Sequence, residues 1–370
     1  MTTYLGPGDL KNRVLPDGWD ADELEKRRTE ANITIEEIAT EVSGAISALN
    51  RELMSDPLYS LMWSLTRDPT VEYPVGSTND WVRMPEYAKA DAKRGKTQGH
   101  MLPLLDWVHP LAWTWKYLRR CRRISIEADV QGLITGGRNR VHKSLLTRFT
   151  QSADDSGVSE LLGSAGYSPG FAHAAASTSV DFTPPEYDGK SFDSDHEHYD
   201  ATNSTAAADW QAAIEAMALD LAEHGHESPF ILLVSYLDRA TIAGLSTFVE
   251  RALPNIVYGS AVDLVQAEDI FFGALTTDDG TVLVASSNRL PQYSMMMWKS
   301  YGVLSPRNPL ALYMVEGQDL LIDLLPDRSY QQFPLEGLVG YSEFGVGVKD
   351  RTAGVCHQMN TASYSDPSIS

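Results

Sequence analysis

The sequence predicts an α+β protein in which helices and strands occupy largely separate stretches of the chain. The 370 residues are 43% hydrophobic and 22% charged, the balance of a folded globular protein with room for two domains or one elaborated domain. Helical periodicity dominates two segments of the first half, whereas strand patterns dominate the last third. Strands and helices alternate only briefly in between, which disfavours a doubly wound parallel sheet.

The N-terminal segment, 1–65, is expected to form an arm followed by a helix. Residues 1–33 are polar and contain Gly and Pro, which is typical of an extended arm. In "TIEE", Thr34 can cap the first helical turn while Glu37 reaches back to it, the pattern of a capping box. The apolar stripe that follows recurs at spacings of three and four: Ile35, Ile38, Val42, Ile46, Leu49 and Leu53.

Residues 66–112 predict an extended hairpin loop. It has two extended flanks, prolines, a tip rich in Lys, Arg and Gly, and almost no apolar periodicity, so it cannot build its own core. Its apolar Trp81, Tyr87 and Leu102 would be unfavourable in water. We therefore expect the loop to pack on a neighbouring subunit. The candidate contact residues at its tip are Lys89, Lys93, Arg94 and Lys96.

Residues 113–149 predict a long helix that bends or breaks at Gly136 and Gly137, because each Gly lowers helix stability by about 1 kcal/mol relative to Ala. Between 116 and 148, nine basic residues accompany two acidic ones. Two interpretations stay open: the basic surface binds an anion, or it pairs with acidic side chains of its own fold. The candidates for the buried face are Tyr117, Ile124, Ala128, Val141, Leu145 and Phe149.

The remaining chain predicts an acidic, loop-rich passage over 150–205, followed by short alternating elements. A helix is expected over 206–224, with Gly225 as its C-terminal stop. A buried strand, "PFILLVSY", then precedes a helix, "DRATIAGLSTFVERAL", capped by Asp238. Strands close the chain: a hairpin turning at "DDG", a hairpin turning at "EGQ", and two strands within 338–358.

The richest polar cluster is "DSDHEHYD", which contains Asp193, Asp195, His196, Glu197, His198 and Asp200. Two His at i and i+2 can share a metal ion only in an extended segment, and the sequence positions no third ligand. A second pair, His224 and His226, falls at a helix end, where His is favourable without any metal. A structural or surface role is favoured for both pairs, and no metal site is predicted.

No other motif predicts an enzyme or a cofactor. Gly345 and Gly347 lack the helix and the distant acid of a dinucleotide-binding loop, and there is no Walker loop or nucleophile elbow. Cys121 and Cys356, so far apart in sequence, are expected to be free thiols in a reducing compartment. No apolar run suffices for a membrane span, the first residues lack the core of a signal peptide, and the net charge of −20 disfavours a surface that binds nucleic acid all over.

Four motifs, in this order, resemble the major capsid proteins of tailed bacteriophages. "GHMLPLLDWVHPLAWTWKYLRR" (99–120) is similar to the junction between their extended loop and their long spine helix. "VDFTPPEYDGKSFDSDHEHY" (180–199) and "LAEHGHESPFILLVS" (221–235) resemble the passages that lead into the apical domain. "YSEFGVGVKDRTAGV" (341–355) resembles the last strands.

The resemblance implies the Hong Kong 97-type capsid fold, which encapsulin shells share. It implies an N-terminal arm, an extended loop, a peripheral domain formed by 113–200 and 316–370 with the spine helix at 113–149, and an apical domain at 201–315. It further implies hexamers and pentamers that tile an icosahedral shell around double-stranded DNA in the virion, after synthesis in the host cytoplasm. Portal, scaffolding, protease and decoration proteins are the further partners that it implies.

Under this interpretation, the basic spine segment faces packaged DNA without sequence preference. The candidate DNA-facing residues are Arg119, Arg120, Arg122, Arg123, Arg138 and Arg140. Gly345 and Gly347 let strands bend or approach closely, and the turn with Asp350 and Arg351 is a candidate contact between subunits. Two alternatives stay open: an encapsulin-like shell that encloses a cargo enzyme, and a cytosolic metal-dependent hydrolase that uses the 193–200 cluster.

Overall fold

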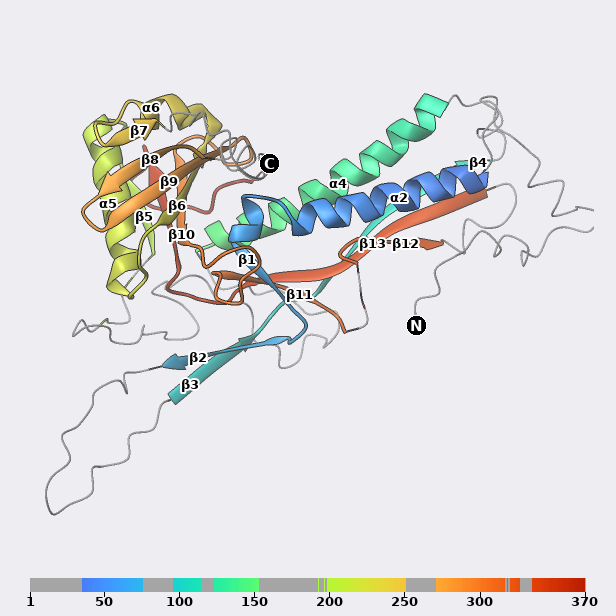
Figure 1. Ribbon diagram of the computed structural model, residues 1–370, viewed down its shortest axis with the longest axis horizontal. Coiled ribbons are helices and arrows are strands. Elements are labelled where there is room, and N and C mark those ends of the chain that lie inside the picture. Colours follow the sequence, from blue (N-terminus) through green and yellow to red (C-terminus); the bar gives the residue numbers. More distant parts are fainter. Residues whose placement is uncertain are drawn as a thin grey trace, which may run out of the picture. The chain divides into compact units, whose positions relative to one another are not determined.

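The structure is a computed structural model, and it describes residues 35–75, 96–114, 117, 123–152, 192, 196, 198–250, 271–316, 318, 320–326 and 335–369 (Figure 1). The chain divides into two compact units. The first unit comprises Met1–Ser55, Leu105–Val141 and Met314–Phe344, and the second comprises Asp56–Leu104, His142–Tyr313 and Gly345–Ser370. Among the described residues, no helix is long and apolar enough to cross a membrane.

Two helices and an antiparallel sheet make up the first unit. Helix α2 spans Ile35–Met54, and helix α4 spans Arg123–Thr150, with its residues up to Val141 in this unit. Strand β13 (Leu335–Val348), whose residues up to Phe344 lie in this unit, pairs antiparallel with β12 (Asp323–Pro326) on one side and with β4 (Leu105–Thr114) on the other.

Helix α2 forms where the capping and periodicity of the sequence predict it. The four residues of the predicted stripe whose side chains are described are all buried: Val42, Ile46, Leu49 and Leu53. Asn50 joins this helix to the chain just before β12, because its Nδ2 donates to Ile322 O (2.8 Å) and its Oδ1 accepts from Ile322 N (2.9 Å). One buried amide therefore satisfies both backbone groups of a residue that lies outside regular structure.

A seven-stranded mixed sheet and helix α5 (Ala207–Glu223) form the main core of the second unit. The order is β5-β14-β10-β6-β9-β8-β7, with parallel pairing at β5–β14 and β6–β9. The bounds are β5 Tyr199–Thr202, β6 Phe230–Ser235, β7 Phe248–Glu250, β8 Phe271–Thr277, β9 Gly280–Ser287, β10 Ser294–Lys299 and β14 Gly354–Met359.

The core of this unit confirms the predicted pattern of α5. Its stripe residues Trp210, Ile214, Met217 and Leu221 are all at most 1% exposed and pack against the strands. Gly225 follows the helix with φ of 82°, the left-handed conformation of a C-terminal stop. The sequence therefore predicted the helix, its buried face and its end.

A short parallel pair and a separate hairpin complete the second unit. Strand β1 (Trp63–Thr66) lies parallel to β11 (Leu310–Met314). Strands β2 (Thr70–Val75) and β3 (Lys96–Met101) pair antiparallel, which confirms paired strands within the predicted extended loop. The short turn Tyr59–Leu61 precedes β1, and Tyr236–Asp238 leads into the one-turn helix α6 (Arg239–Ala243).

Two details of the long helix predicted over 113–149 were wrong. The helix predicted over 113–149 does not include Trp113, which lies in β4, where it is buried and donates from Nε1 to Asp129 Oδ2 at 2.9 Å. Alternating burial in a paired strand outweighs the local helical pattern there. Helix α4 also runs through Gly136 and Gly137 without a break, and a Cβ at Gly137 would lie 2.6 Å from Ile322 Cδ1. This glycine permits close packing rather than a bend.

The helix predicted from Asp238 is far shorter than expected. It ends at Ala243, because Gly244 follows and Phe248–Glu250 then pairs with β8. Asp238 makes no capping hydrogen bond in α6. It accepts instead from Tyr293 N at 2.7 Å.

The hairpin predicted to turn at "EGQ" was also wrong, although both of its strands exist. Strands β11 and β12 do not pair with each other, because β13 lies between them in the sheet order. The "DDG" hairpin is confirmed as β8 and β9, with Thr277 opposite Gly280. Strand β14 pairs with β10 in the seven-stranded sheet, while the predicted division into peripheral and apical domains stays a prediction.

Candidate functional site

Two segments form the base of the β2–β3 hairpin: the "LPL" turn, residues 102–104, and the glycines Gly345 and Gly347 of the 341–355 motif. Leu102 and Leu104 are each 2% exposed, and Leu102 N donates to Pro69 O at 2.7 Å. A Cβ at Gly345 would lie 1.6 Å from Pro103 O, and one at Gly347 would lie 2.4 Å from Leu102 Cδ2. The close approach predicted for these two glycines is confirmed, and two motifs far apart in sequence meet here.

The hairpin itself pairs with no further strand in the part of the chain that the structure describes. A two-stranded antiparallel sheet alone is marginally stable in water, so this feature calls for a partner surface. Of the predicted tip contacts, Lys89, Lys93 and Arg94 lie outside the described residues. Lys96 is the first residue of β3, and its side chain is not among those described.

The charged turn after β13 is held mainly by its own subunit. Asp350 accepts from Thr352 N (3.0 Å) and Thr352 Oγ1 (2.7 Å), and Asp350 N donates to Pro309 O (3.1 Å). Arg351 is only 3% exposed. The predicted contact between subunits stays a prediction for this turn, and a neighbour could reach Asp350 far more easily than the Arg351 side chain.

The basic residues predicted on the spine helix fall into two groups. Arg119, Arg120 and Arg122 lie outside the described residues, and Arg123 begins α4 without a described side chain. In contrast, Arg138 and Arg140 both have partners within the subunit, described next.

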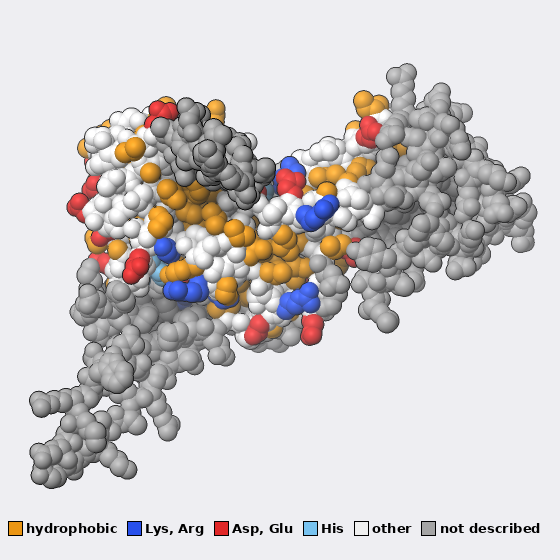
Figure 2. Space-filling view, in the orientation of Figure 1, with side chains coloured by type: hydrophobic (Ala, Val, Ile, Leu, Met, Phe, Trp, Pro, Cys, Tyr) orange, Lys and Arg blue, Asp and Glu red, His pale blue; other side chains and the backbone are white. Residues whose placement is uncertain are grey.

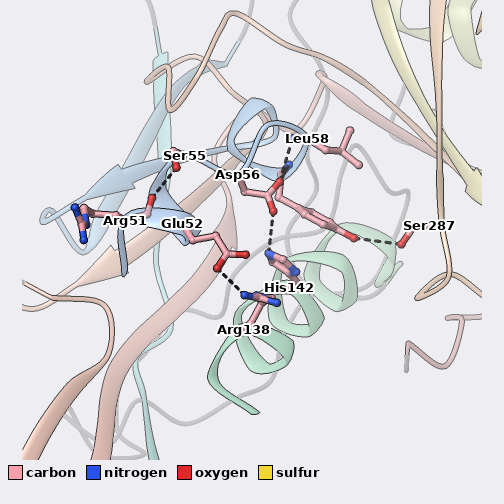
Figure 3. A network of polar contacts seen from close by, with 9 residues as sticks. Arg51, Glu52, Ser55, Asp56, Leu58, Arg138, His142 and Ser287 are labelled. Atoms are coloured by element: carbon pink, nitrogen blue, oxygen red, sulfur yellow. Dashed lines mark hydrogen bonds and ion pairs between the residues drawn. The ribbon is translucent and has the colours of Figure 1, made fainter. Parts of the chain in front are cut away.

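Arg138 forms an ion pair with Glu52 on α2 (Nη2 to Oε2, 2.5 Å; Figure 3). The Arg140 guanidinium lies over the Trp107 ring, 3.1 Å from its centroid, in a cation–π contact. Burial lowers the pKa of Arg140 from its ordinary value. Arg138 therefore pairs with an acidic side chain of its own fold, as in the second of the two interpretations that the sequence left open, whereas Arg140 contacts an aromatic ring. The predicted contact of both residues with DNA stays a prediction.

On the face that Figure 2 draws, the Lys and Arg side chains of the described residues form small separate groups and no continuous basic area. Several large hydrophobic side chains of the described residues are exposed by more than half, on separate elements, and single exposed side chains of this kind need no partner: Val108, Ile124, Tyr236, Leu237, Val249 and Val303.

A second polar network anchors the part of α4 that belongs to the second unit (Figure 3). Asp56 Oδ1 accepts from Leu58 N and Tyr59 N, which caps the turn that follows, and its Oδ2 lies 3.5 Å from His142 Nε2. The His142 ring stacks on Tyr59 at 4.2 Å, and Tyr59 OH lies 3.2 Å from Ser287 Oγ. The network is buried and structural in character.

The structure brings His224 together with His196 and His198, although the sequence places His224 in a separate pair with His226. His196 and His198 precede β5, and His224 is the residue that ends α5. Their Nε2 atoms lie 2.9 Å (His196–His224), 2.9 Å (His198–His224) and 3.2 Å (His196–His198) apart. No local sequence signal could reveal this cluster, because its third member is 26 residues from His198.

The partner that the sequence proposed for His224 lies elsewhere. His226 Nδ1 is 2.7 Å from Tyr301 OH, and its Nε2 is 3.0 Å from Thr352 Oγ1. Both of its ring nitrogens are therefore engaged outside the cluster.

Burial favours the neutral form of His198 and of His224. Desolvation, with the neighbouring His196 and His226, lowers the pKa of His224 to about 3, and desolvation with His224 nearby lowers the pKa of His198 well below its ordinary value. Nearby, desolvation and the charges of Asp200 and Glu223 raise the pKa of Asp220 to about 7.

Comparison with known proteins gives no relative by sequence: no family model matches the chain, and no curated protein matches it. Among solved structures, the chain is similar to one from Mycobacterium phage Patience, with 17% identity, a TM-score of 0.63 and coverage of 92% of each chain. The mature capsid of bacteriophage PhiM1 follows, with 12% identity, a TM-score of 0.46 and coverage of 81% of this chain and 86% of that one. The first likeness shows a shared fold, and the phage-capsid fold predicted from the sequence is confirmed.

Proposed function

We propose that this chain is a major capsid protein that assembles into hexamers and pentamers of an icosahedral phage head. The observation that carries the proposal is the fold shared with a phage chain over 92% of both chains. As a shell subunit the protein needs no catalytic constellation, in agreement with a sequence that offers no enzyme motif.

The hairpin at β2–β3 supports assembly independently of that likeness. It is a two-stranded sheet that pairs with no other strand among the described residues, yet its base is fixed by buried Leu102 and Leu104. A rigid base and an unsupported ribbon are the properties of a segment that a neighbouring subunit stabilises. The basic tip at 89–96 would then meet acidic surface on a neighbour, since the chain as a whole carries a net charge of −20.

Electron microscopy of the chain expressed alone tests the proposal. Closed shells, or free hexamers and pentamers, are the expected result. A monomer that persists at high protein concentration contradicts the proposal.

Charge reversal then tests the hairpin contact. The triple variant Lys93→Glu, Arg94→Glu and Lys96→Glu should fold yet fail to form shells, whereas Lys143→Glu, on the exposed surface of α4, should assemble normally. Shell yield of the triple variant equal to that of wild type would contradict a contact between the tip and a neighbour.

The contents of the shell separate a phage head from an encapsulin-like compartment. We place double-stranded DNA inside, held without sequence preference by the basic residues before and at the start of α4: Arg119, Arg120, Arg122 and Arg123. The cargo alternative gains support from Arg138 and Arg140, because side chains that already contact Glu52 and Trp107 within the subunit are less available to bind DNA. Nuclease-protected DNA in particles from infected cells supports the head. Particles that instead hold an enzyme and no DNA support the compartment.

A further inference from the structure

Hydrogen bonds among the three histidines beside β5 cannot explain why their Nε2 atoms all lie so close together. Each Nε2 atom lies within 3.2 Å of the other two. An imidazole nitrogen either carries a hydrogen and donates, or carries a lone pair and accepts. With three mutually close nitrogens, at least two must be of the same kind, so one contact always sets donor against donor or acceptor against acceptor. This holds in every protonation state.

One member of the cluster has a defined tautomer. His198 Nδ1 lies 2.8 Å from Gly354 O, a carbonyl that can only accept, so Nδ1 carries the hydrogen. The Nε2 of neutral His198 therefore presents its lone pair to the other two rings. A histidine whose second nitrogen donates to a backbone carbonyl is oriented as metal-binding histidines usually are.

We infer that His196, His198 and His224 form a binding site for a divalent transition-metal ion, with Zn²⁺ as the most general candidate. A single cation would accept all three lone pairs and remove the conflict between like atoms. Three nitrogens bound to one ion at about 2.0–2.1 Å lie about 3.3 Å apart in tetrahedral geometry and about 2.9 Å apart on an octahedral face. The three observed distances, 2.9, 2.9 and 3.2 Å, fall within this range.

The surroundings suit a structural ion. His198 is fully buried, and the Phe192 ring packs against His196 (4.9 Å between centroids) and His224 (4.4 Å). The ion would join the residues just before β5 to the residue just after α5. Along the chain, these two parts of the second unit are separated by β5 and the whole of α5. The coordination positions left open would be filled by water or another donor. The site therefore adds a stabilising ligand to the proposed shell subunit and implies no catalysis.

Metal binding to the untagged full-length chain tests the inference. The chain is stripped with EDTA, dialysed, and titrated with ZnCl₂ by calorimetry, and Co²⁺ serves as a spectroscopic probe. We expect one ion per chain, visible Co²⁺ absorption bands of a nitrogen-ligated site, and a Tm that rises with the Zn²⁺ concentration. Wild-type chain that binds no stoichiometric Zn²⁺ or Co²⁺ would overturn the inference, whatever the variants do.

Variants identify the ligands. His196→Gln and His224→Gln should each weaken Zn²⁺ binding by about 100-fold or more and abolish the Co²⁺ bands, because each removes one of three ligands. The matched control His109→Gln alters an exposed histidine of β4 in the other unit and should bind as wild type does. Far-ultraviolet circular dichroism without metal checks that each variant folds. The inference would also be overturned if folded His196→Gln and His224→Gln bound Zn²⁺ as tightly as wild type does.

Discussion

Replacing Gly345 by Ala should destabilise the subunit strongly, because the new Cβ would clash with the backbone of Pro103. It would lie 1.6 Å from Pro103 O and 2.4 Å from Pro103 C, whereas ordinary van der Waals contacts begin near 3.4 Å. Both obstructing atoms belong to the backbone, so no side-chain rotation relieves the clash. Overpacking in a core commonly lowers stability by about 1–3 kcal/mol, and we expect a loss of about 3 kcal/mol or more here.

Two further glycine variants provide the scale. A Cβ at Gly347 meets the flexible end of Leu102 at 2.4 Å, so Gly347→Ala should lose less stability than Gly345→Ala. A Cβ at Gly44, on the exposed face of α2, meets nothing within 4 Å. Gly44→Ala should therefore stabilise the chain by about 1 kcal/mol through its higher helix propensity.

Denaturant unfolding of the unassembled chain, followed by tryptophan fluorescence, measures all three variants. The expected order of stability is Gly44→Ala above wild type, wild type above Gly347→Ala, and Gly345→Ala lowest. If Gly345→Ala unfolds at the same denaturant concentration as wild type, the close approach of the "LPL" turn to this glycine is refuted.

Three further predictions concern polar groups that are buried or partly buried. Asn308→Ala should lose about 3 kcal/mol, because the fully buried amide donates to Trp63 O (3.1 Å) and Gly302 O (2.9 Å) and accepts from Tyr301 N (3.0 Å), and all three hydrogen bonds are lost in the variant; chemical unfolding measures the loss. Asp220→Asn removes a carboxyl whose pKa is raised to about 7, so the stabilisation that protonated Asp220 gives the folded state is complete below about pH 4 and fades as the pH rises to about 7. Thermal scans should show wild type losing up to roughly 4 kcal/mol relative to Asp220→Asn over that interval. Arg140→Ala should lower subunit stability by about 0.5–2 kcal/mol through loss of its contact with Trp107.

Each of these predictions has a contradicting outcome. The exposed Asn288→Ala serves as the control for Asn308, and equal stability of the two variants would mean that the buried amide contributes nothing. For Asp220, a stability difference that does not change with pH would show that folding does not raise the pKa of this carboxyl. Unchanged subunit stability of Arg140→Ala would show that the contact with Trp107 does not stabilise the subunit.

The elements that the sequence predicted well are those whose burial follows from local periodicity. In α5, Trp210, Ile214, Met217 and Leu221 recur at helical spacing, and all four are buried. The same reasoning failed where partners distant in sequence compete with local preference. Trp113 joined a strand because β13 pairs with β4, and β11 and β12 were separated because β13 lies between them.

The candidate surfaces divide in the same way. The sequence located the hairpin, and it also identified Gly345 and Gly347 as points of close approach, because few other functions explain glycines within a strand pattern. It could not decide what Arg138 and Arg140 do, since their partners, Glu52 and Trp107, are 86 and 33 positions away.

By itself, then, the sequence determined the α+β class, the amphipathic helices and the resemblance to a capsid fold, because periodicity, turn residues and short motifs are properties of neighbouring positions. The tertiary structure was needed to show which strands pair, that Arg138 forms an ion pair with Glu52, and that His196, His198 and His224 meet. Such contacts depend on the path of the chain through space, since side chains interact over a few ångströms however many residues separate them along the sequence.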